Sequence, residues 1–395
     1  MAQRCPTILK SVFFVLIGLV GLSLLLGVTT QVDEADSEAM FEVATTQEDN
    51  IVVPSTLSDL PVPLPDLPVP LPDLPVPLPD LPAPPVHILL LTEGRSGSTW
   101  LSSFFWAHPD VYYLFEPLYK TPSWRREGCE DTLSERTRCD QEVLSRFWSC
   151  DLEKRGGKMN VLGRYPNYHL PCSENPGLCS GTDHSEKAGW CMSKTHRVAK
   201  TIRLWDLENI KGIMENPDYD VRVIHLVRDP RPLVKSRSKA AFGTIDGFHS
   251  HTKYTLEDYR TQSGVLCERM LTAARLGDNP PSWLQGRYFR VRHEDMSVAP
   301  IETARALYNF THLPWTVEME KRIHDTAVGE GGDTGFFGVA RQSALLVNKW
   351  KTEWSWELIE TVTEACYETI QYLGYETDLE KLQEFREHEA GNSDA

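Results

Sequence analysis

Basic residues are missing from a long stretch of the sequence, since no lysine or arginine occurs between Lys10 and Arg95. The chain of 395 residues carries 40 basic and 56 acidic side chains, a formal net charge of −16. Eleven of the acids fall within residues 29–85. Subtracting them, with Arg4 and Lys10, leaves 38 basic against 45 acidic side chains, or −7, for residues 86–395. This balance lacks the basic excess of nucleic-acid-binding proteins, but it allows local basic sites for anions.

Charged side chains are also absent from residues 11–28, most of which are large and apolar. The run is near the lower end of the roughly 17–25 residues that span a bilayer. It is longer than the roughly 7–15 apolar residues of a cleaved signal peptide, and no Ala-x-Ala-like cleavage site follows it. Because the basic residues precede it, the positive-inside rule predicts a cytoplasmic tail at 1–10 and a signal anchor at 11–28. The rest of the chain would then be lumenal.

Proline excludes a helix from the next segment. Residues 59–79 are three identical copies of Asp-Leu-Pro-Val-Pro-Leu-Pro, and each proline removes an amide donor and clashes with the preceding turn. Polyproline II, at ~3.1 Å per residue, predicts that residues 59–85 form an extended spacer on the order of 80 Å long. We interpret residues 29–85 as an acidic and proline-rich stem. A docking site for a proline-binding domain is the alternative.

Cys-x-x-Cys pairs are absent, which disfavours a structural zinc site. Eight of the nine cysteines follow the apolar run, and an even number in an oxidising compartment predicts disulfides. The pairing stays open at this point. The eight are Cys129, Cys139, Cys150, Cys172, Cys179, Cys191, Cys267 and Cys366.

A Gly/Ser-rich loop at residues 93–99 lies between an apolar run at 86–91, typical of a buried parallel strand, and a predicted helix at 100–106. This order is typical of an anion cradle, because glycine lets backbone amides approach the anion and the helix N-terminus adds unpaired N–H groups. The loop is not a Walker A motif, since Gly94 and Gly97 are three apart and no lysine precedes the hydroxyl residues. An ordinary tight turn is the alternative.

A second strand–turn–helix pattern follows at residues 221–239. The apolar run 221–227 leads into Arg228-Asp-Pro-Arg-Pro, and proline is favourable at the start of a helix. Arg228 at the strand exit and Ser236 on the helix together would bind a second anion. The alternatives are an Arg228–Asp229 ion pair and an exposed hydroxyl at Ser236. Two anion sites on strand ends of one sheet suit a nucleotide with phosphates at two places.

These two segments resemble the donor-binding elements of Golgi carbohydrate sulfotransferases, most closely the galactose/N-acetylgalactosamine/N-acetylglucosamine 6-O-sulfotransferase branch. Further similar segments occur in the same order at residues 110–119, 200–203, 288–295 and 348–350. The resemblance covers most of residues 86–375 and is weak over 121–190. It implies an α/β fold with a central parallel sheet and a P-loop-like strand–loop–helix donor site in a lumenal domain, residues 86–395. It also implies a single-pass type II protein of the Golgi membrane.

The donor implied by the resemblance is 3′-phosphoadenosine 5′-phosphosulfate, a co-substrate, and no metal is required. Position by position, the 5′-phosphosulfate would be bound by Arg95, Ser96, Gly97, Ser98, Thr99, Trp100 and Leu101. The 3′-phosphate would be bound by Arg228, Asp229, Pro230, Arg231, Pro232, Leu233, Val234, Lys235 and Ser236. Two residues depart from the branch: Trp100 stands where phenylalanine is common, and Glu93 places an unusual negative charge beside the loop.

Sulfate transfer needs an in-line acceptor hydroxyl, a base for its proton and donors for the departing phosphate oxygen. The resemblance places Glu116 beside the donor sulfate, so we predict Glu116 as the base and Arg95 as the residue that stabilises the leaving group. A capping or ion-pairing carboxylate is the alternative for Glu116. His196 is the second candidate base, and a hydrogen-bonded structural histidine is its alternative.

Three further predictions concern other parts of the chain. Arg341 and Lys349 would close over the donor, or else be exposed helix charges. Asn309-Phe-Thr is the one N-glycosylation sequon. The predicted partners are a glycan acceptor at the 6-position of one of the three sugars and a membrane, through one N-terminal helix. Nucleic acid is excluded and a homodimer is left open.

Two rival functions are a P-loop-like kinase, which should carry a Walker lysine and magnesium carboxylates, and a non-catalytic lumenal glycan-binding protein.

Overall fold

The computed structural model describes residues 84–120, 133–152, 184–239, 254–329, 344 and 347–393. The chain divides into two compact units, Met1–Pro77 and Leu78–Ala395, and all the described residues belong to the second. The predicted anchor at 11–28 and the repeats at 59–79 therefore lie outside the described residues. Among the described helices, none is both long enough and apolar enough to span a bilayer.

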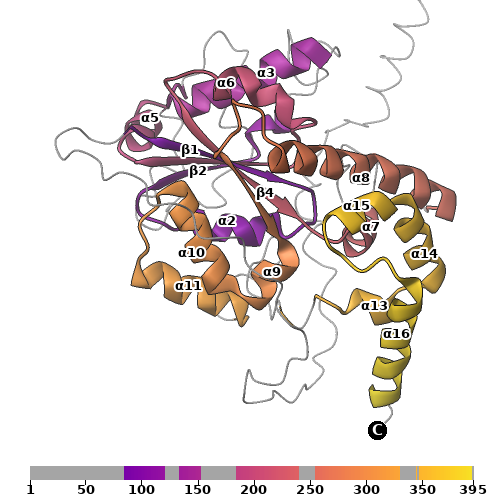
Figure 1. The fold of residues 1–395 in the computed structure, drawn as a ribbon. Helices are drawn as coiled ribbons and strands as arrows, with labels where there is room; N and C mark the ends of the chain where they lie inside the picture. The colour runs from indigo at the N-terminus through magenta and orange to yellow at the C-terminus, as the bar shows by residue number, and fades with distance from the viewer. Residues whose placement is uncertain are drawn as a thin grey trace, which may run out of the picture. The chain divides into compact units, whose positions relative to one another are not determined.

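A five-stranded parallel sheet forms the centre of this unit, which confirms the central parallel sheet expected from the sequence (Figure 1). The order is β2-β3-β1-β4-β5, and every neighbouring pair is parallel. The strands are β1 (Val86–Thr92), β2 (Val111–Phe115), β3 (His196–Thr201), β4 (Asp220–Val227) and β5 (Tyr288–Arg292). β1 is central and all seven of its residues are buried, as its unbroken apolar run predicts.

The strand order reverses at β1. The next two strands in sequence lie on one side of it and the last two on the other. Leu91, near the end of β1, is level with Thr201 on β3 and His225 on β4. The segments that leave these three strands therefore emerge together at the carboxyl edge of the sheet. In open α/β sheets, ligands bind outside this edge at the point where the order reverses.

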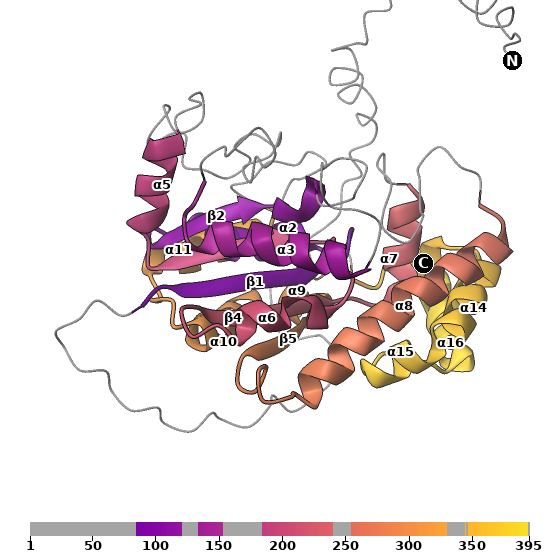
Figure 2. The ribbon, with the colours of Figure 1, turned by 90° about the horizontal axis from the view of Figure 1, so that it is seen from above.

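Helices cover both faces of the sheet (Figures 1 and 2). One face carries α2 (Ser98–Trp106), α9 (His293–Val298), α10 (Pro300–Thr311) and α11 (Val317–Ala327). The other carries α3 (Leu133–Trp148), η4 (Leu207–Ile210) and α6 (Lys211–Met214). β1 divides its side chains between the two cores: Ile88 and Leu90 join the first, and Leu89 and Leu91 the second.

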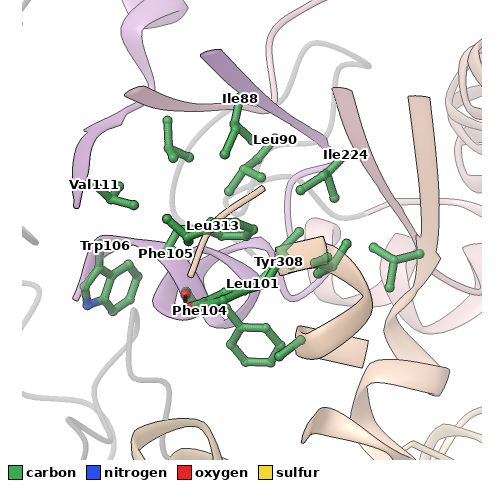
Figure 3. Close-up of a cluster of buried hydrophobic side chains, with 14 of the residues drawn as sticks. Ile88, Leu90, Leu101, Phe104, Phe105, Trp106, Val111, Ile224, Tyr308 and Leu313 are labelled. Atoms are coloured by element: carbon green, nitrogen blue, oxygen red, sulfur yellow. Dashed lines mark hydrogen bonds between the residues drawn. The ribbon is translucent and has the colours of Figure 1, made fainter. Parts of the chain in front are cut away.

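The helix that follows the first anion loop is held firmly by the first core (Figure 3). Leu101, Phe104 and Phe105 of α2 are fully buried against the Ile88 and Leu90 side of the sheet. Each such side chain contributes about 1.5–3 kcal/mol of burial free energy. This packing fixes the N-terminus of α2 at the carboxyl edge.

A third core lies beside the sheet and joins α7 (Pro230–Ser238) to α8 (Leu256–Asp278), α14 (Trp356–Ala365) and α15 (Tyr367–Tyr372). α14 and α15 follow each other directly in the chain and are separated by Cys366 alone. The remaining elements are η2 (Pro117–Lys120), α5 (His184–Met192), α13 (Trp350–Glu353) and α16 (Leu379–Ser393).

Disulfides confirm the oxidised state that the cysteine count predicts. Cys267 of α8 is bonded to Cys366, which separates α14 from α15. Cys150, just after α3, is bonded to Cys191 of α5. Cys139 is disulfide-bonded as well.

Candidate functional site

The two predicted anion loops meet at the carboxyl edge. Arg95 Nε donates to Ser236 Oγ at 3.1 Å, although 141 residues separate them. Arg228 Nη1 donates to the backbone carbonyl of Arg95 at 3.0 Å, across 133 residues. Three of the residues selected from sequence therefore form one contact network, with Arg95 at its centre.

The backbone of the first loop adopts a conformation that depends on glycine. Gly97 has a φ of 90° and forms the N-cap of α2, where it offers no side chain to cap the first amides. A Cβ at this position would lie 2.5 Å from Nδ1 of His293, so alanine is excluded by contact as well as by backbone strain. The first N–H groups of α2 are left for an external acceptor. Arg95 also has a positive φ, 69°.

Glu116 lies in the turn between β2 and η2, with a φ of 50°, and its carboxylate is buried. Lys200 Nζ donates to its Oε1 at 2.7 Å, and Arg203 Nη1 donates to its Oε2 at 2.6 Å. The amide of Ile202 adds a third bond at 3.3 Å. Burial acts to raise the pKa of Glu116, but the two cations outweigh it, so the pKa is lowered. The ion-pairing alternative for Glu116 is thus observed, while its action as a base stays a prediction.

Comparison with known proteins identifies the family of this chain. Residues 204–317 match the Sulfotransferase family. Human carbohydrate sulfotransferase 6 is 30% identical over 322 residues, which cover 73% of this chain and 80% of the relative. Human carbohydrate sulfotransferase 3 is 28% identical over 327 residues, covering 74% and 67%. The chain belongs to the carbohydrate sulfotransferase family.

This family membership makes the protein an enzyme that transfers sulfate to carbohydrates, and it sets aside the kinase and the non-catalytic glycan-binding protein. The solved structure of a mouse sulfotransferase, SULT7A1 complexed with PAP, aligns with 76% of this chain and 89% of its own. Its sequence identity is 10% and its TM-score is 0.40.

The second predicted anion loop, residues 228–236, contains both partly exposed and buried side chains. Arg228, Lys235 and Ser236 are partly exposed, whereas Leu233 and Val234 are fully buried in the third core. The last two can therefore reach a ligand only through their backbone.

Asp229 has a structural role in this segment. It accepts from the Arg231 amide at 3.0 Å at the start of α7, and from the Arg231 guanidinium at 2.9 and 2.7 Å. That guanidinium lies 4.7 Å from the ring of Trp350. The ion pair observed at Asp229 is thus with Arg231, which is buried in the protein.

Glu93, whose charge is unusual at this position, is neutralised by two buried arginines. Arg237 Nη2 donates to Glu93 Oε2 at 2.9 Å, and Arg269 donates to both carboxylate oxygens, through Nε at 2.9 Å and through Nη2. Arg237 Nε also donates to the Gly94 carbonyl at 2.9 Å. Burial lowers the pKa of Arg237 to about 10 and Glu93 partly offsets this, so Arg237 stays charged at neutral pH. The cluster carries one net positive charge directly behind the loop.

His196 lies at the amino-terminal ends of the strands, opposite the carboxyl ends that carry the anion loops. It begins β3, level with Val86 at the start of β1. One ring nitrogen bonds Thr195 Oγ1 at 2.8 Å and the other bonds the Thr311 carbonyl at 3.0 Å. Burial lowers its pKa. The structural alternative for His196 is therefore the one observed.

Sequence reasoning missed the cations that hold the two carboxylates, and it gave His293 no role. His293 lies against Gly97, and its ring is 6.2 Å from that of Trp100. Burial and the nearby charge of Arg228 keep its pKa well below the usual value, so it is neutral. The sequence does indicate that His293 lies near the anion loops, because His293 directly follows β5 and the carboxyl ends of parallel strands lie together.

Two peripheral predictions are placed by the structure. Lys349 is exposed and pairs with Glu353 at 3.1 Å, which fits the exposed-charge alternative. Arg341 lies outside the described residues. Asn309 is exposed on α10, while Thr311, the third residue of its sequon, is buried.

The Glu93 cluster gives a stability prediction. Glu93→Gln leaves Arg237 and Arg269 buried without their counter-charge, so we expect the free energy of unfolding to fall by about 3–5 kcal/mol. Urea titration with the disulfides intact measures this. Glu364→Gln is the matched control, because it breaks an exposed pair with Arg260 at 2.8 Å and should cost under ~1 kcal/mol. Equal losses in the two variants would show that Glu93 contributes no more than a surface charge.

Proposed function

We propose that the protein transfers the sulfuryl group of 3′-phosphoadenosine 5′-phosphosulfate to the 6-hydroxyl of galactose, N-acetylgalactosamine or N-acetylglucosamine in a glycan. The observation that carries this proposal is the meeting of Arg95, Arg228 and Ser236 at the carboxyl ends of β1 and β4. Anion-binding side chains from two loops that meet at one end of the sheet suit a nucleotide with phosphates at both the 3′ and 5′ positions.

The residues present fit this donor. Arg95 now donates to a neutral hydroxyl on Ser236, and a phosphate oxygen is a stronger acceptor for a guanidinium. Gly97 leaves the first amides of α2 uncapped, and the charged cluster at Glu93 lies behind the loop. Arg95 and these amides would hold the 5′-phosphosulfate. Arg228 and Ser236 would hold the 3′-phosphate.

The chemistry then divides among a few side chains. When bound, the donor supplies a sulfuryl group attached to a phosphate leaving group. The acceptor oxygen forms a bond to sulfur while the bond from sulfur to the phosphate oxygen breaks. Glu116 takes the hydroxyl proton. Arg95 and the α2 amides stabilise the negative charge that the leaving oxygen gains.

Glu116 needs a change in its surroundings before it can act as a base, because Lys200 and Arg203 now lower its pKa. We infer that the anionic donor attracts these two cations and weakens their bonds to Glu116. The pKa of the carboxylate would then rise, because its burial acts to raise the pKa and the two cations would oppose this less. In this proposal the base becomes active only when the donor is present.

Transfer of labelled sulfate from the donor to the methyl β-glycosides of the three sugars tests the function. We expect transfer to at least one of them and none to its 6-deoxy analogue. Arg228→Ala should raise the donor KM about tenfold or more, since a lost charge-assisted bond to an anion costs ~1.5–3 kcal/mol.

Arg228→Lys, which keeps the charge, should lie between Arg228→Ala and the wild type. Arg275→Ala, which removes an exposed charge from α8, should leave the donor KM unchanged. Absence of transfer by the wild type to all three sugars would overturn the proposed function. An unchanged donor KM in a folded Arg228→Ala variant would remove Arg228 from the donor site alone.

Glu116→Gln tests the base. It keeps the shape and removes the basicity, so kcat should fall roughly 10²–10⁴-fold while binding of 3′-phosphoadenosine 5′-phosphate survives. The fall in kcat of the wild type at acidic pH, where the carboxylate is protonated, should disappear in the variant. Glu116→Asp, which retains a carboxylate with a shorter reach, should keep part of the activity. A kcat within a few-fold of wild type would exclude Glu116 as the base.

We also propose a type II orientation in the Golgi membrane, with the catalytic unit lumenal. The apolar run at 11–28, the disulfides Cys150–Cys191 and Cys267–Cys366, and an exposed Asn309 support it. Protease added to sealed Golgi vesicles should leave the catalytic unit intact until detergent is added, whereas a tag at residue 1 should be removed at once. Cleavage of the catalytic unit in sealed vesicles would reverse this orientation.

A further inference from the structure

Trp205 is an exposed tryptophan at the carboxyl edge of the sheet. It is 39% exposed, while Trp100, Trp148 and Trp350 are all buried. Tryptophan has a large apolar area with only two side-chain torsions, and in soluble domains it is highly buried on average. An exposed tryptophan beside a catalytic edge therefore needs an explanation.

The segment that carries Trp205 borders both parts of the proposed site. The amide of Ile202 and the guanidinium of Arg203 both donate to Glu116, at 3.3 and 2.6 Å. The Ile202 side chain also lies 3.4 Å from the place that a Cβ on Gly94 would occupy. Trp205 is three residues after Ile202 in the sequence, so it belongs to the segment that borders the proposed site.

Trp205 is exposed at the same strand ends as Glu116. Leu204 is buried in the second core, whereas Arg203 and Trp205 on either side of it are partly exposed. Arg203 and Trp205 both follow β3, so they lie at the carboxyl ends of the strands together with Glu116, which follows β2.

Arg269 holds the Trp205 ring in place. Its guanidinium carbon lies 5.6 Å from the ring centroid, within the range of a cation–π contact. The same guanidinium is bonded to Glu93 at the start of the anion loop. Trp205 is thus an exposed aromatic surface whose position is tied to that loop.

We propose that Trp205 binds the acceptor by stacking against the C–H face of a pyranose ring. This inference rests on the proposed function, because the acceptor hydroxyl must lie beside Glu116. A pyranose ring has an apolar face of axial hydrogens, which matches the exposed face of an indole, and its hydroxyls stay free for polar partners. The sugar that stacks on Trp205 would be the sugar that is sulfated.

Substitution of Trp205 tests the stacking. Trp205→Ala should raise the KM for the methyl β-glycoside that the wild type sulfates by about tenfold, equivalent to ~1.4 kcal/mol, with the donor KM unchanged. Trp205→Phe, which retains an aromatic face, should recover most of the affinity. Tyr367→Ala removes an aromatic residue, 50% exposed, from α15 and should change neither KM.

Direct binding separates this inference from the proposed function. Saturation-transfer NMR should show the methyl glycoside bound to the wild type and to Tyr367→Ala, and much weaker binding to Trp205→Ala. If the wild type transfers sulfate and Trp205→Ala keeps its acceptor KM, the stacking is wrong and the function stands. If Trp205→Ala raises the donor KM instead, the ring acts only through Arg269 on the loop, and the acceptor role is overturned. If the wild type transfers no sulfate, the function fails and the inference fails with it.

Discussion

The buried carboxylate of Glu93 sets the shape of the first anion loop, residues 93–99. It accepts bonds from Arg237 on α7 and Arg269 on α8, and Arg237 also holds the Gly94 carbonyl. One residue later, Arg95 adopts a positive φ, and at Gly97 only glycine fits. Hydrogen bonds from α7 and α8 therefore fix the start of the loop, and the packed helix α2 fixes its end. Without the carboxylate, two buried guanidiniums would repel each other directly beneath the loop.

Glu116 repeats this arrangement at the end of β2, which is separated from β1 by β3. A buried carboxylate again lies between two cations, here Lys200 and Arg203. The Glu93 group and the Glu116 group, each a carboxylate with two cations, have one net positive charge apiece. Arg95 and Arg228 each add one further positive charge. An acidic chain thereby has a positive field at one sheet edge. This distribution of charge suits the proposed anionic donor. Negative charges on the rest of the surface repel anions, so that other anions bind less non-specifically.

The sequence was sufficient for local structure and for the pairing of the two loops. The apolar runs at β1 and β4, followed by Gly/Ser or proline, predict strand–turn–helix units with ends on one edge, and Arg95, Arg228 and Ser236 meet there. It was not sufficient for the partners of the two carboxylates. Arg237 and Arg269 lie 144 and 176 residues after Glu93, and no local pattern connects residues so far apart.

The choice between Glu116 and His196 shows which information was missing. Residue type favours histidine, since its usual pKa is near neutrality. Position favours glutamate, because His196 begins β3 and Glu116 follows β2, so the two are at opposite edges of a parallel sheet. In a parallel sheet only the residues that follow a strand share an edge with the anion loops. Arg203 and Trp205, which follow β3, meet this condition, and so does His293, which follows β5. The same condition that separates His196 from the anion loops therefore brings Arg203 and Trp205 to the strand ends at which Glu116 lies.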